Sequence, residues 1–336
     1  MKKKTSLKDI AQHCGVSIAL VSYVMNNKKE GRIRKEVAEK IRETAVKLNY
    51  RPNEIAKSLK TNKTFTIGVI VADISNPFSS GLARIIEDEA NNHGYTVIFG
   101  SSDENATKSS KLIDAFLNRQ VDGLIISPPA GSEMQIIQLK KQQVPFVLLD
   151  RYFPEIDADH VSLDNYTAAY KAVKHLAMTD RKKIGMITYK TPLHNLQERE
   201  RGYRTAIKAA NIRFKKEWLQ QVSINNDQKE IEQAVKNLLL PGEAVNAMLF
   251  GSNRIAVAAL KYINSISLKV PEDLSLIGFD ETEIFDFFHA PLTYVRQPLL
   301  ELGQMATQIL IDNISKKKTT QQVFLPGELI VRKSSL

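Results

Sequence analysis

Residues 6–27 read SLKDIAQHCGVSIALVSYVMNN, and this stretch decides the fold of the N-terminal part of the chain. Leu7, Ile10 and Ala11 have the i, i+3, i+4 spacing of one face of a short helix. Gly15 interrupts that helix and offers the flexible residue that a tight turn needs. Two helices that cross closely require a small residue at their contact and a flexible residue between them. The stretch therefore predicts a helix-turn-helix.

The second helix of this motif is expected over about residues 18–26, with Ser17 as its cap. Val21 and Val24 face inward from it. A third helix, over about 34–48, has an apolar stripe that completes a small core: Val37, Ile41, Ala45 and Leu48. Because the second helix of such a motif enters the major groove of DNA, its cap and outer face supply the candidate DNA contacts: Ser17, Ile18, Ala19, Ser22, Tyr23 and Asn26. An αα-hairpin with no DNA role remains the alternative.

The net charge of +10 is concentrated in residues 1–63, which hold 16 Lys and Arg against 6 Asp and Glu. The remaining 273 residues balance 31 basic against 31 acidic side chains (47 less 16 and 37 less 6). A compact basic segment is typical of a domain that binds a polyanion. A solvated charged tail is the alternative, but the apolar periodicity of the segment favours an ordered domain.

The composition is that of an ordinary globular protein, with 43% hydrophobic and 25% charged residues in a chain of 336. No apolar run approaches the ~18–20 residues that cross a bilayer. The basic residues 2–4 are followed by a mostly polar stretch rather than by the apolar region of a signal peptide. The single Cys14 cannot form an intramolecular disulfide. We therefore expect a cytoplasmic protein without a membrane partner.

From residue 65 onward, short apolar strands alternate with amphipathic helices, which predicts parallel sheets with crossover helices in two similar α/β lobes. Strands are expected at about 65–71, 95–99, 121–126, 145–149, 183–188, 245–250 and 274–279. Helices are expected at about 77–93, 106–119, 133–142, 165–178, 196–210, 228–239, 254–265 and 298–314. Strands near 323 and 329–331 are expected to cross back between the lobes.

Polar side chains follow the predicted strands, at the edge of an open α/β sheet where ligands bind. Their amides, carboxylates and guanidinium groups can form paired hydrogen bonds with vicinal hydroxyls, and Phe78 offers a ring face to a sugar. Two of these residues also suit purely structural roles, since Asp103 could cap a helix and Arg199 could pair with Glu198 or Glu200. The candidates after the strands of the first lobe are Asp73, Ser75, Asn76, Phe78, Asp103 and Arg151, and those from the second lobe are Arg199, Asn253 and Asp280.

An enzyme is the first competing hypothesis. The strand-to-helix turns carry neither G-x-G-x-x-G nor G-x-x-x-x-G-K-[ST], and the chain has no G-x-S-x-G or H-E-x-x-H motif. The sequence therefore predicts no catalytic residues, no metal site and no cofactor. A freestanding solute-binding protein is the second competing hypothesis. Such a protein would need an export signal and would not carry a basic helix-turn-helix.

The stretch at 6–27 closely resembles the N-terminus of the LacI/GalR family of bacterial transcriptional regulators, as do LNYRPN (48–53) and AKSLK (56–60). Six later segments resemble the periplasmic sugar-binding-protein fold of that family's effector domain: IGVIVADISNPF (67–78), DGLIIS (122–127), VPFVLLDR (144–151), LIGFD (276–280), TYVRQP (293–298) and LPGELIVR (325–332). The resemblance covers essentially the whole chain.

The resemblance implies three parts. They are a helix-turn-helix headpiece over 1–50, a hinge over 51–63, and an effector-binding and dimerisation domain over 64–336, whose lobes are about 64–160 with 293–322 and 161–292 with 323–336. In the family, a hinge leucine from each subunit wedges into the minor groove of the operator. Leu59 matches it, and Lys57 and Lys60 can hold phosphates beside it. A plain linker is the alternative.

The resemblance also implies the function. We expect a transcriptional repressor that binds a near-palindromic double-stranded operator as a homodimer, because no heptad segment of tetrameric members follows the last strand. The residues that match family effector contacts are Phe78, Asp103, Arg151, Arg199, Asn253 and Asp280. Arg151 directly after Leu149-Asp150 is seen in sugar-responsive members, which favours a sugar or sugar derivative over a purine. The effector's identity, and whether it releases DNA, stay open.

The chain departs from the family pattern in the DNA-binding helix. Leu20 stands where the family commonly has Thr, and Tyr23 where it has Arg. The third helix begins at Ile33-Arg34 rather than at a Ser cap. Ile18 and Ala19 offer apolar contacts that suit thymine methyl groups. The family's usual half-site is therefore not expected to apply unchanged.

Overall fold

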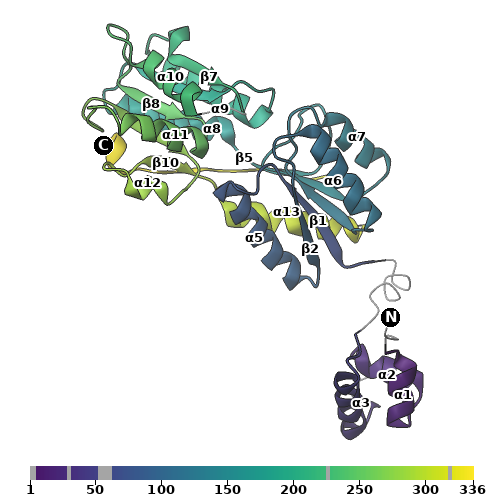
Figure 1. Cartoon of the computed structure of the whole chain (residues 1–336). Coiled ribbons are helices and arrows are strands. Elements are labelled where there is room, and N and C mark those ends of the chain that lie inside the picture. Colours follow the sequence, from purple (N-terminus) through teal and green to yellow (C-terminus); the bar gives the residue numbers. More distant parts are fainter. Residues whose placement is uncertain (1–4, 29–31, 52–62, 225–227, 317–319) are drawn as a thin grey trace. The chain divides into compact units, whose positions relative to one another are not determined.

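The computed structural model describes residues 5–28, 32–51, 63–224, 228–316 and 320–336. The chain divides into two compact units, residues 1–64 and 65–336, and each is described by itself (Figure 1). Within the described residues, no helix is long and apolar enough to span a membrane. The expected α/β fold class, with an all-α N-terminal unit and two lobes of parallel sheet, is confirmed.

The N-terminal unit consists of α1 (Leu7–Cys14), α2 (Ile18–Met25) and α3 (Lys35–Lys47). Ser6 and Asp9 form a capping box at the start of α1, in which each side chain accepts a hydrogen bond from the other residue's backbone N–H. The predicted helix-turn-helix is therefore present. Its buried core is Ile10, Ala11, Cys14, Val21, Val24, Ile41 and Ala45.

The turn between the first two helices is built as the sequence predicts. Gly15 adopts a left-handed conformation at φ 70°, and its N–H donates to the carbonyl of Ala11 to close α1. Two residues later the Ser17 side chain accepts a hydrogen bond from the Leu20 N–H and begins α2. These local bonds fix the angle at which α2 leaves the turn.

The first lobe of the larger unit is a parallel sheet in the order β11-β5-β4-β3-β1-β2. Alternate residues of β1 point to opposite faces: Val69 packs with α5 and α13, and Ile70 packs with α6 and α7. The strands are β1 (Thr66–Val71), β2 (Thr96–Ser101), β3 (Gly123–Ile126), β4 (Phe146–Leu149), β5 (His160–Leu163) and β11 (Gln322–Leu325). The helices are α5 (Pro77–Asn92), α6 (Ala106–Asn118), α7 (Glu133–Lys141) and α13 (Leu299–Ile314).

The second lobe is a sheet in the order β12-β10-β9-β8-β6-β7, parallel except for β12. Tyr203, Phe250, Phe279 and Phe285 are its largest fully buried side chains. The strands are β6 (Ile184–Tyr189), β7 (Leu219–Val222), β8 (Ala247–Phe250), β9 (Ser275–Phe279), β10 (Thr293–Arg296) and β12 (Glu328–Ile330). The helices are α8 (Asn165–Met178), α9 (His194–Ala209), α10 (Gln228–Leu238), α11 (Asn253–Ile263) and α12 (Ile284–Phe287), with 3₁₀ turns at Lys216–Trp218 and Lys333–Ser335.

The sheets correct the expected lobe boundaries at two strands. Strand β10, expected in the first lobe, pairs with β9 and β12 in the second. Strand β11, expected in the second lobe, pairs with β5 in the first. The chain therefore crosses between lobes after β5, after β10 and after β11. The apolar pattern does not predict β5, β7 and β10 as strands, because their sequences mix polar with apolar residues.

Helices α8 and α9 pack closely at Gly202. A Cβ added there would lie 2.3 Å from the backbone carbonyl oxygen of Tyr166, which cannot swing aside as the end of a side chain can. We therefore expect Gly202→Ala to lower the free energy of unfolding by about 1–3 kcal/mol, the usual cost of overpacking. Calorimetry of the full chain measures this as a lower Tm.

Gly81→Ala in α5 is the matched control. Its Cβ would lie 3.5 Å from Leu299 Cδ1, an ordinary contact. Replacing a helix glycine by alanine usually stabilises by about 0.5–1 kcal/mol, so this variant should keep or raise the Tm. An equal fall in Tm in both variants would show that the close approach of α8 to Gly202 does not limit the size of the side chain at this position.

Candidate functional site

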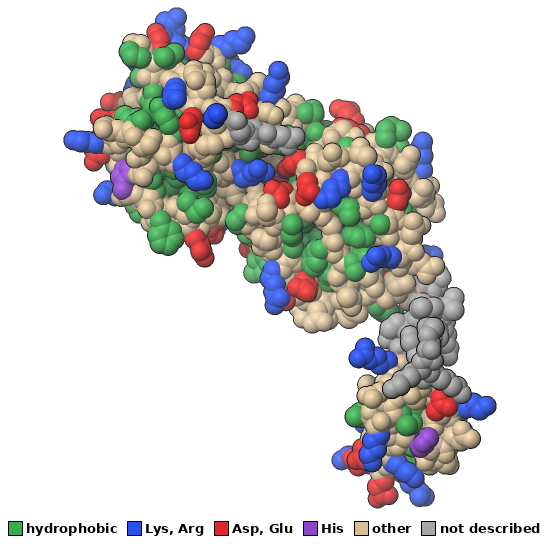
Figure 2. Space-filling model, viewed as in Figure 1, with side chains coloured by type: hydrophobic (Ala, Val, Ile, Leu, Met, Phe, Trp, Pro, Cys, Tyr) green, Lys and Arg blue, Asp and Glu red, His purple; other side chains and the backbone are tan. Residues whose placement is uncertain are grey.

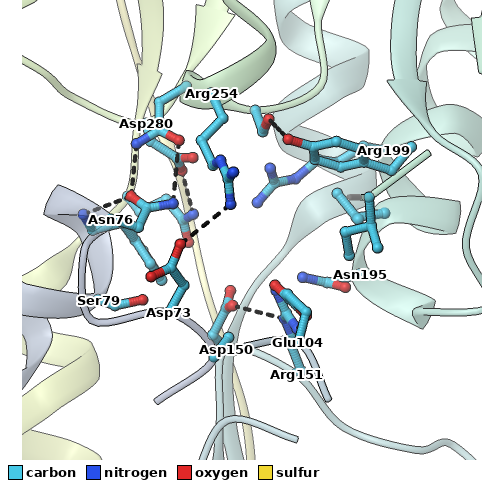
Figure 3. Close-up of a pocket in the computed structure, with 18 residues that line it drawn as sticks. Asp73, Asn76, Ser79, Glu104, Asp150, Arg151, Asn195, Arg199, Arg254 and Asp280 are labelled. Carbon is cyan, nitrogen blue, oxygen red and sulfur yellow. Dashed lines mark hydrogen bonds and ion pairs between the residues drawn. The ribbon is translucent and has the colours of Figure 1, made fainter. Parts of the chain in front are cut away.

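A cleft between the two lobes, at the carboxyl ends of their strands, brings the polar candidates together (Figure 3). Its cavity volume is about 70 Å³. Such sheet edges are the usual ligand sites of open α/β folds. Five of the six residues that match family effector contacts line it: Phe78, Arg151, Arg199, Asn253 and Asp280.

Two pairs of side chains bridge the lobes across this cleft. Asn253 Nδ2 donates to Asn76 Oδ1 at 2.9 Å, and Asn76 Nδ2 donates in return to Asn253 Oδ1 at 3.4 Å. Arg254 Nη1 lies 3.2 Å from Asp73 Oδ2. Asn76 also caps α5, since its Oδ1 accepts from the N–H of Phe78 at 3.0 Å. The cap places the half-buried Phe78 ring in the wall of the cleft.

Arg151 and Glu104 form a bidentate ion pair on the first-lobe side, with both N–O distances 2.6 Å and both side chains 12% exposed. Burial works to lower the pKa of Arg151, but the hydrogen bonds and charge of Glu104, together with Asp150 and Tyr189, hold that pKa above its usual value. The neighbouring Asp150 is buried, which raises its pKa to about 6 against the opposing effect of Arg151 and Arg199.

Arg199 is held from the second lobe and is only 3% exposed. Its Nε donates to Asn165 Oδ1 at 2.7 Å and its Nη1 donates to the Gly251 carbonyl at 2.8 Å. The guanidinium also lies 4.2 Å from the centre of the Phe279 ring. Burial lowers the pKa of Arg199, and the carboxylates of Asp280 and Asp150 oppose that shift.

The alternative of a surface pair between Arg199 and its neighbours is wrong. Glu198 pairs with Arg201 and Glu200 with Arg204, both on the outer face of α9. Arg199 points inward between them because successive helix residues are turned by about 100°.

Asp280 follows β9 in a left-handed conformation at φ 67° and is 7% exposed. Its Oδ1 accepts from Gln297 Nε2 at 2.6 Å. The Ser252 side chain caps α11 by accepting from the Ile255 N–H, which fixes Asn253 in the first turn. Asp280 and Asn253 therefore stand on rigid element ends.

The prediction that Asp103 contacts the effector is corrected, because Asp103 does not line the cleft. Its carboxylate accepts from Ser101 Oγ at 2.5 Å and pairs with Lys108, and its side chain is 57% exposed. Lys108 and Ser101 lower its pKa. Glu104, the next residue, lines the cleft in its place. Ser75 likewise lies outside the lining and bonds to Asp73.

Sequence reasoning missed several further lining residues: Glu104, Asp150, Tyr189, Asn195, Arg254 and Gln297. Asp150 and Tyr189 stand at or just after the ends of strands that the sequence predicts, a signal that could have found them, whereas Gln297 follows β10, which it does not predict. Three lining atoms are buried without a hydrogen-bond partner in the part of the chain that the structure describes: Arg151 Nε, Asn195 Oδ1 and Gln297 Oε1. Buried polar atoms are normally bonded, so these atoms suit a polar ligand.

The lining can hold a polyhydroxylated molecule. Carboxylates accept from hydroxyl groups, guanidinium and amide groups donate to them, and Phe78 supplies a ring face. Ligand pockets usually enclose about 300–1,000 Å³, so this cavity is small for one, and the two bridging pairs cross it. No group of three or more metal-binding side chains occurs among the residues described.

The candidate DNA contacts lie on the outer side of α2. Ser17, Ile18, Ala19 and Asn26 are exposed, and Ser22 and Tyr23 are half-buried. The described part of this unit has exposed basic side chains over its surface (Figure 2): Lys8, Lys28, Arg32, Arg34, Lys35, Lys40, Arg42, Lys47 and Arg51. The hinge candidates Lys57, Leu59 and Lys60 lie outside the described residues.

Both units match families of known proteins. Residues 6–53 match the family of bacterial regulatory proteins, lacI family, and residues 173–335 match the periplasmic binding protein-like domain. The chain is 31% identical to a ribose operon repressor of Halalkalibacterium halodurans, over 98% of this chain and 97% of that protein. It is 32% identical to catabolite control protein A of Priestia megaterium, over 98% of this chain and 99% of that protein.

Solved structures share the fold of this chain. The lac repressor dimer bound to operator and an anti-inducer shares the fold, with a TM-score of 0.87 at 22% identity, covering 99% of this chain and 100% of that chain. A LacI family regulator from Enterococcus faecium with bound ribose has a TM-score of 0.70 at 28% identity, covering 80% of this chain and 98% of that chain. The chain has a helix-turn-helix and a two-lobed ligand-binding fold, and its relatives match it from end to end. It therefore belongs to the lacI family of bacterial regulatory proteins.

Proposed function

We propose that this protein is a sequence-specific transcriptional repressor of the cytoplasm, whose affinity for operator DNA is controlled by a sugar or sugar derivative. The observation that carries the proposal is the combination, in one chain, of a helix-turn-helix with exposed basic side chains and a polar cleft lined from two lobes. Its relatives at 31–32% identity include a ribose operon repressor and a catabolite control protein. No catalytic role is assigned to the lining.

For DNA binding, residues 1–50 act as the headpiece and 51–63 as the hinge. The outer face of α2 reads base edges in the major groove, while Lys57 and Lys60 hold phosphates and Leu59 enters the minor groove. Two headpieces of a homodimer, which pairs through residues 64–336, reach two half-sites of a near-palindrome. Tyr23 offers one hydroxyl and a ring to the bases in place of a guanidinium.

For effector binding, the cleft supplies contacts from both lobes. Arg151 and Phe78 come from the first lobe, and Arg199, Asn253 and Asp280 from the second. A ligand held by both sets favours the arrangement of lobes in which all contacts are made. It must replace the Asn76–Asn253 bonds that already cross the cleft. The resulting change in lobe arrangement alters operator affinity, with a coupling usually of about 1–3 kcal/mol.

Selection of DNA from a random duplex library tests the proposal. The full chain should enrich a near-palindromic site, and at least one sugar should change its affinity for that site. Tyr23→Ala should relax the preference at one position of each half-site, because base contacts specify sequence. Lys57→Ala should weaken binding to all DNA sequences about equally, because phosphate contacts do not depend on the sequence. Failure to enrich any sequence would refute the regulator function.

A further inference from the structure

The loop after β2 presents two adjacent carboxylates in opposite directions. Asp103 and Glu104 both have left-handed backbone conformations, with φ of 50° and 57°. Outside the cleft, Ser101 and Lys108 hold the Asp103 side chain. Two successive left-handed residues without glycine are costly, and here they turn the Glu104 side chain into the cleft toward Arg151 (Figure 3).

Glu104 occupies both donor directions of one edge of the Arg151 guanidinium. Nη1 donates to Oε2 and Nη2 to Oε1, each at 2.6 Å. This two-point geometry is the one that a phosphate or a carboxylate of a ligand would otherwise adopt on an arginine. An anionic ligand must therefore displace a buried carboxylate of the protein, or bind beside it.

The other arginines of the lining also have carboxylates beside them. Arg254 pairs with Asp73 at 3.2 Å. Arg199 interacts electrostatically with the carboxylates of Asp280 and Asp150. The lining holds four carboxylates and three guanidinium groups, a formal charge of −1: Asp73, Glu104, Asp150 and Asp280 against Arg151, Arg199 and Arg254. If Arg254, with its 52% exposed side chain, turned toward a ligand, Asp73 would be left unpaired and the total would not change.

We infer that Glu104 makes this cleft selective for uncharged or amino-substituted polyols and against phosphorylated or carboxylated ones. The inference rests on the proposed function, because it concerns the same cleft. Glu104 disfavours anionic ligands in two ways. It occupies the edge of the Arg151 guanidinium that would bind an anion, and its own negative charge repels one. Like charges in a buried site are strongly unfavourable. A neutral sugar meets no such penalty and keeps the outer oxygen lone pairs of Glu104 as acceptors.

The test compares matched ligands on the full chain by calorimetric titration. The probes are D-ribose with D-ribose 5-phosphate, and D-glucose with D-glucose 6-phosphate, D-glucuronate and D-glucosamine. For whichever series binds, the neutral or amino sugar should bind at least about tenfold more tightly than its anionic partner. Glu104→Gln retains the shape of the side chain and removes its charge. It should reduce this discrimination about tenfold or more, chiefly by tightening the anionic sugar.

Asp103→Asn is the matched control. It removes the same charge from the adjacent residue of the same loop, outside the cleft, and should leave the discrimination unchanged. The wild-type comparison does not depend on the folding of Glu104→Gln, whose unpaired Arg151 costs stability. Two results would overturn the inference while leaving a sugar-binding regulator in place. One is tighter binding of the sugar phosphate or uronate than of the neutral sugar by the wild type. The other is a folded Glu104→Gln variant that discriminates between them as the wild type does. If no probe binds and none changes operator affinity, the sugar-responsive function fails as well.

Discussion

Raising the salt concentration from 50 to 200 mM is expected to weaken operator binding by the full chain about 10³- to 10⁵-fold. This is the range for a protein that makes about 6–10 phosphate contacts, because each contact releases condensed counterions from DNA. The two subunits of the proposed homodimer, each with 16 basic residues in its first 63, can readily make that many. Fluorescence anisotropy at a series of salt concentrations should give a straight line of log K against log salt.

The cleft provides the internal comparison for this result. Residues 64–336 carry no net charge, and the Arg151–Glu104 pair of the lining is largely buried, so salt screens it much less. Binding of a neutral sugar, which brings no charge of its own to the cleft, should therefore change little over the same range. Operator affinity that is independent of salt would refute phosphate contacts by the basic headpiece.

Asp280→Asn is expected to weaken binding of the effector sugar about 10- to 150-fold and to abolish the operator's response at sugar concentrations that saturate the wild type. The substitution removes a carboxylate, and hydrogen bonds to charged groups contribute about 1.5–3 kcal/mol each. Asparagine tolerates the left-handed backbone at φ 67° that alanine would strain. Calorimetric titration gives the affinity, and anisotropy with and without sugar gives the response.

The same substitution at Asp286 is the control. Asp286 lies in α12 outside the cleft, and its half-exposed carboxylate pairs with Arg332. An exposed pair of this kind contributes about 0–1 kcal/mol, so Asp286→Asn should keep both sugar binding and the response. Without sugar, Asp280→Asn should bind the operator as the wild type does. A wild-type response from Asp280→Asn would place the effector elsewhere in the molecule.

The headpiece could be predicted almost completely from the sequence. The interval from Ala11 through Gly15 to Val21 determines which residues meet, because caps and i, i+4 contacts join residues close together in the chain. The strands with continuous apolar runs, such as β1 and β9, could be predicted within two residues of their observed ends for a related reason. A strand covered by helices on both faces must be apolar on both. These features are local, so the sequence alone determined them.

The cleft depended on contacts between distant residues. Glu104 meets Arg151 across 47 positions, and Asn76 meets Asn253 across 177. Nothing in the dipeptide Asp103-Glu104 tells which carboxylate turns inward. The backbone conformation of the loop decides it, together with Lys108 on the outside and Arg151 on the inside.

The sequence by itself determined the helix-turn-helix, the two-lobed α/β class and, through the family resemblance, five of the six effector-contact candidates that line the cleft. Only the tertiary structure decided that β10 belongs to the second sheet, that Gln297 after it bonds to Asp280, and that Glu104 replaces Asp103. The physical reason is the range of the forces. Propensity, caps and apolar periodicity act within a few residues, whereas sheet pairing and ion pairing follow from how the whole chain packs.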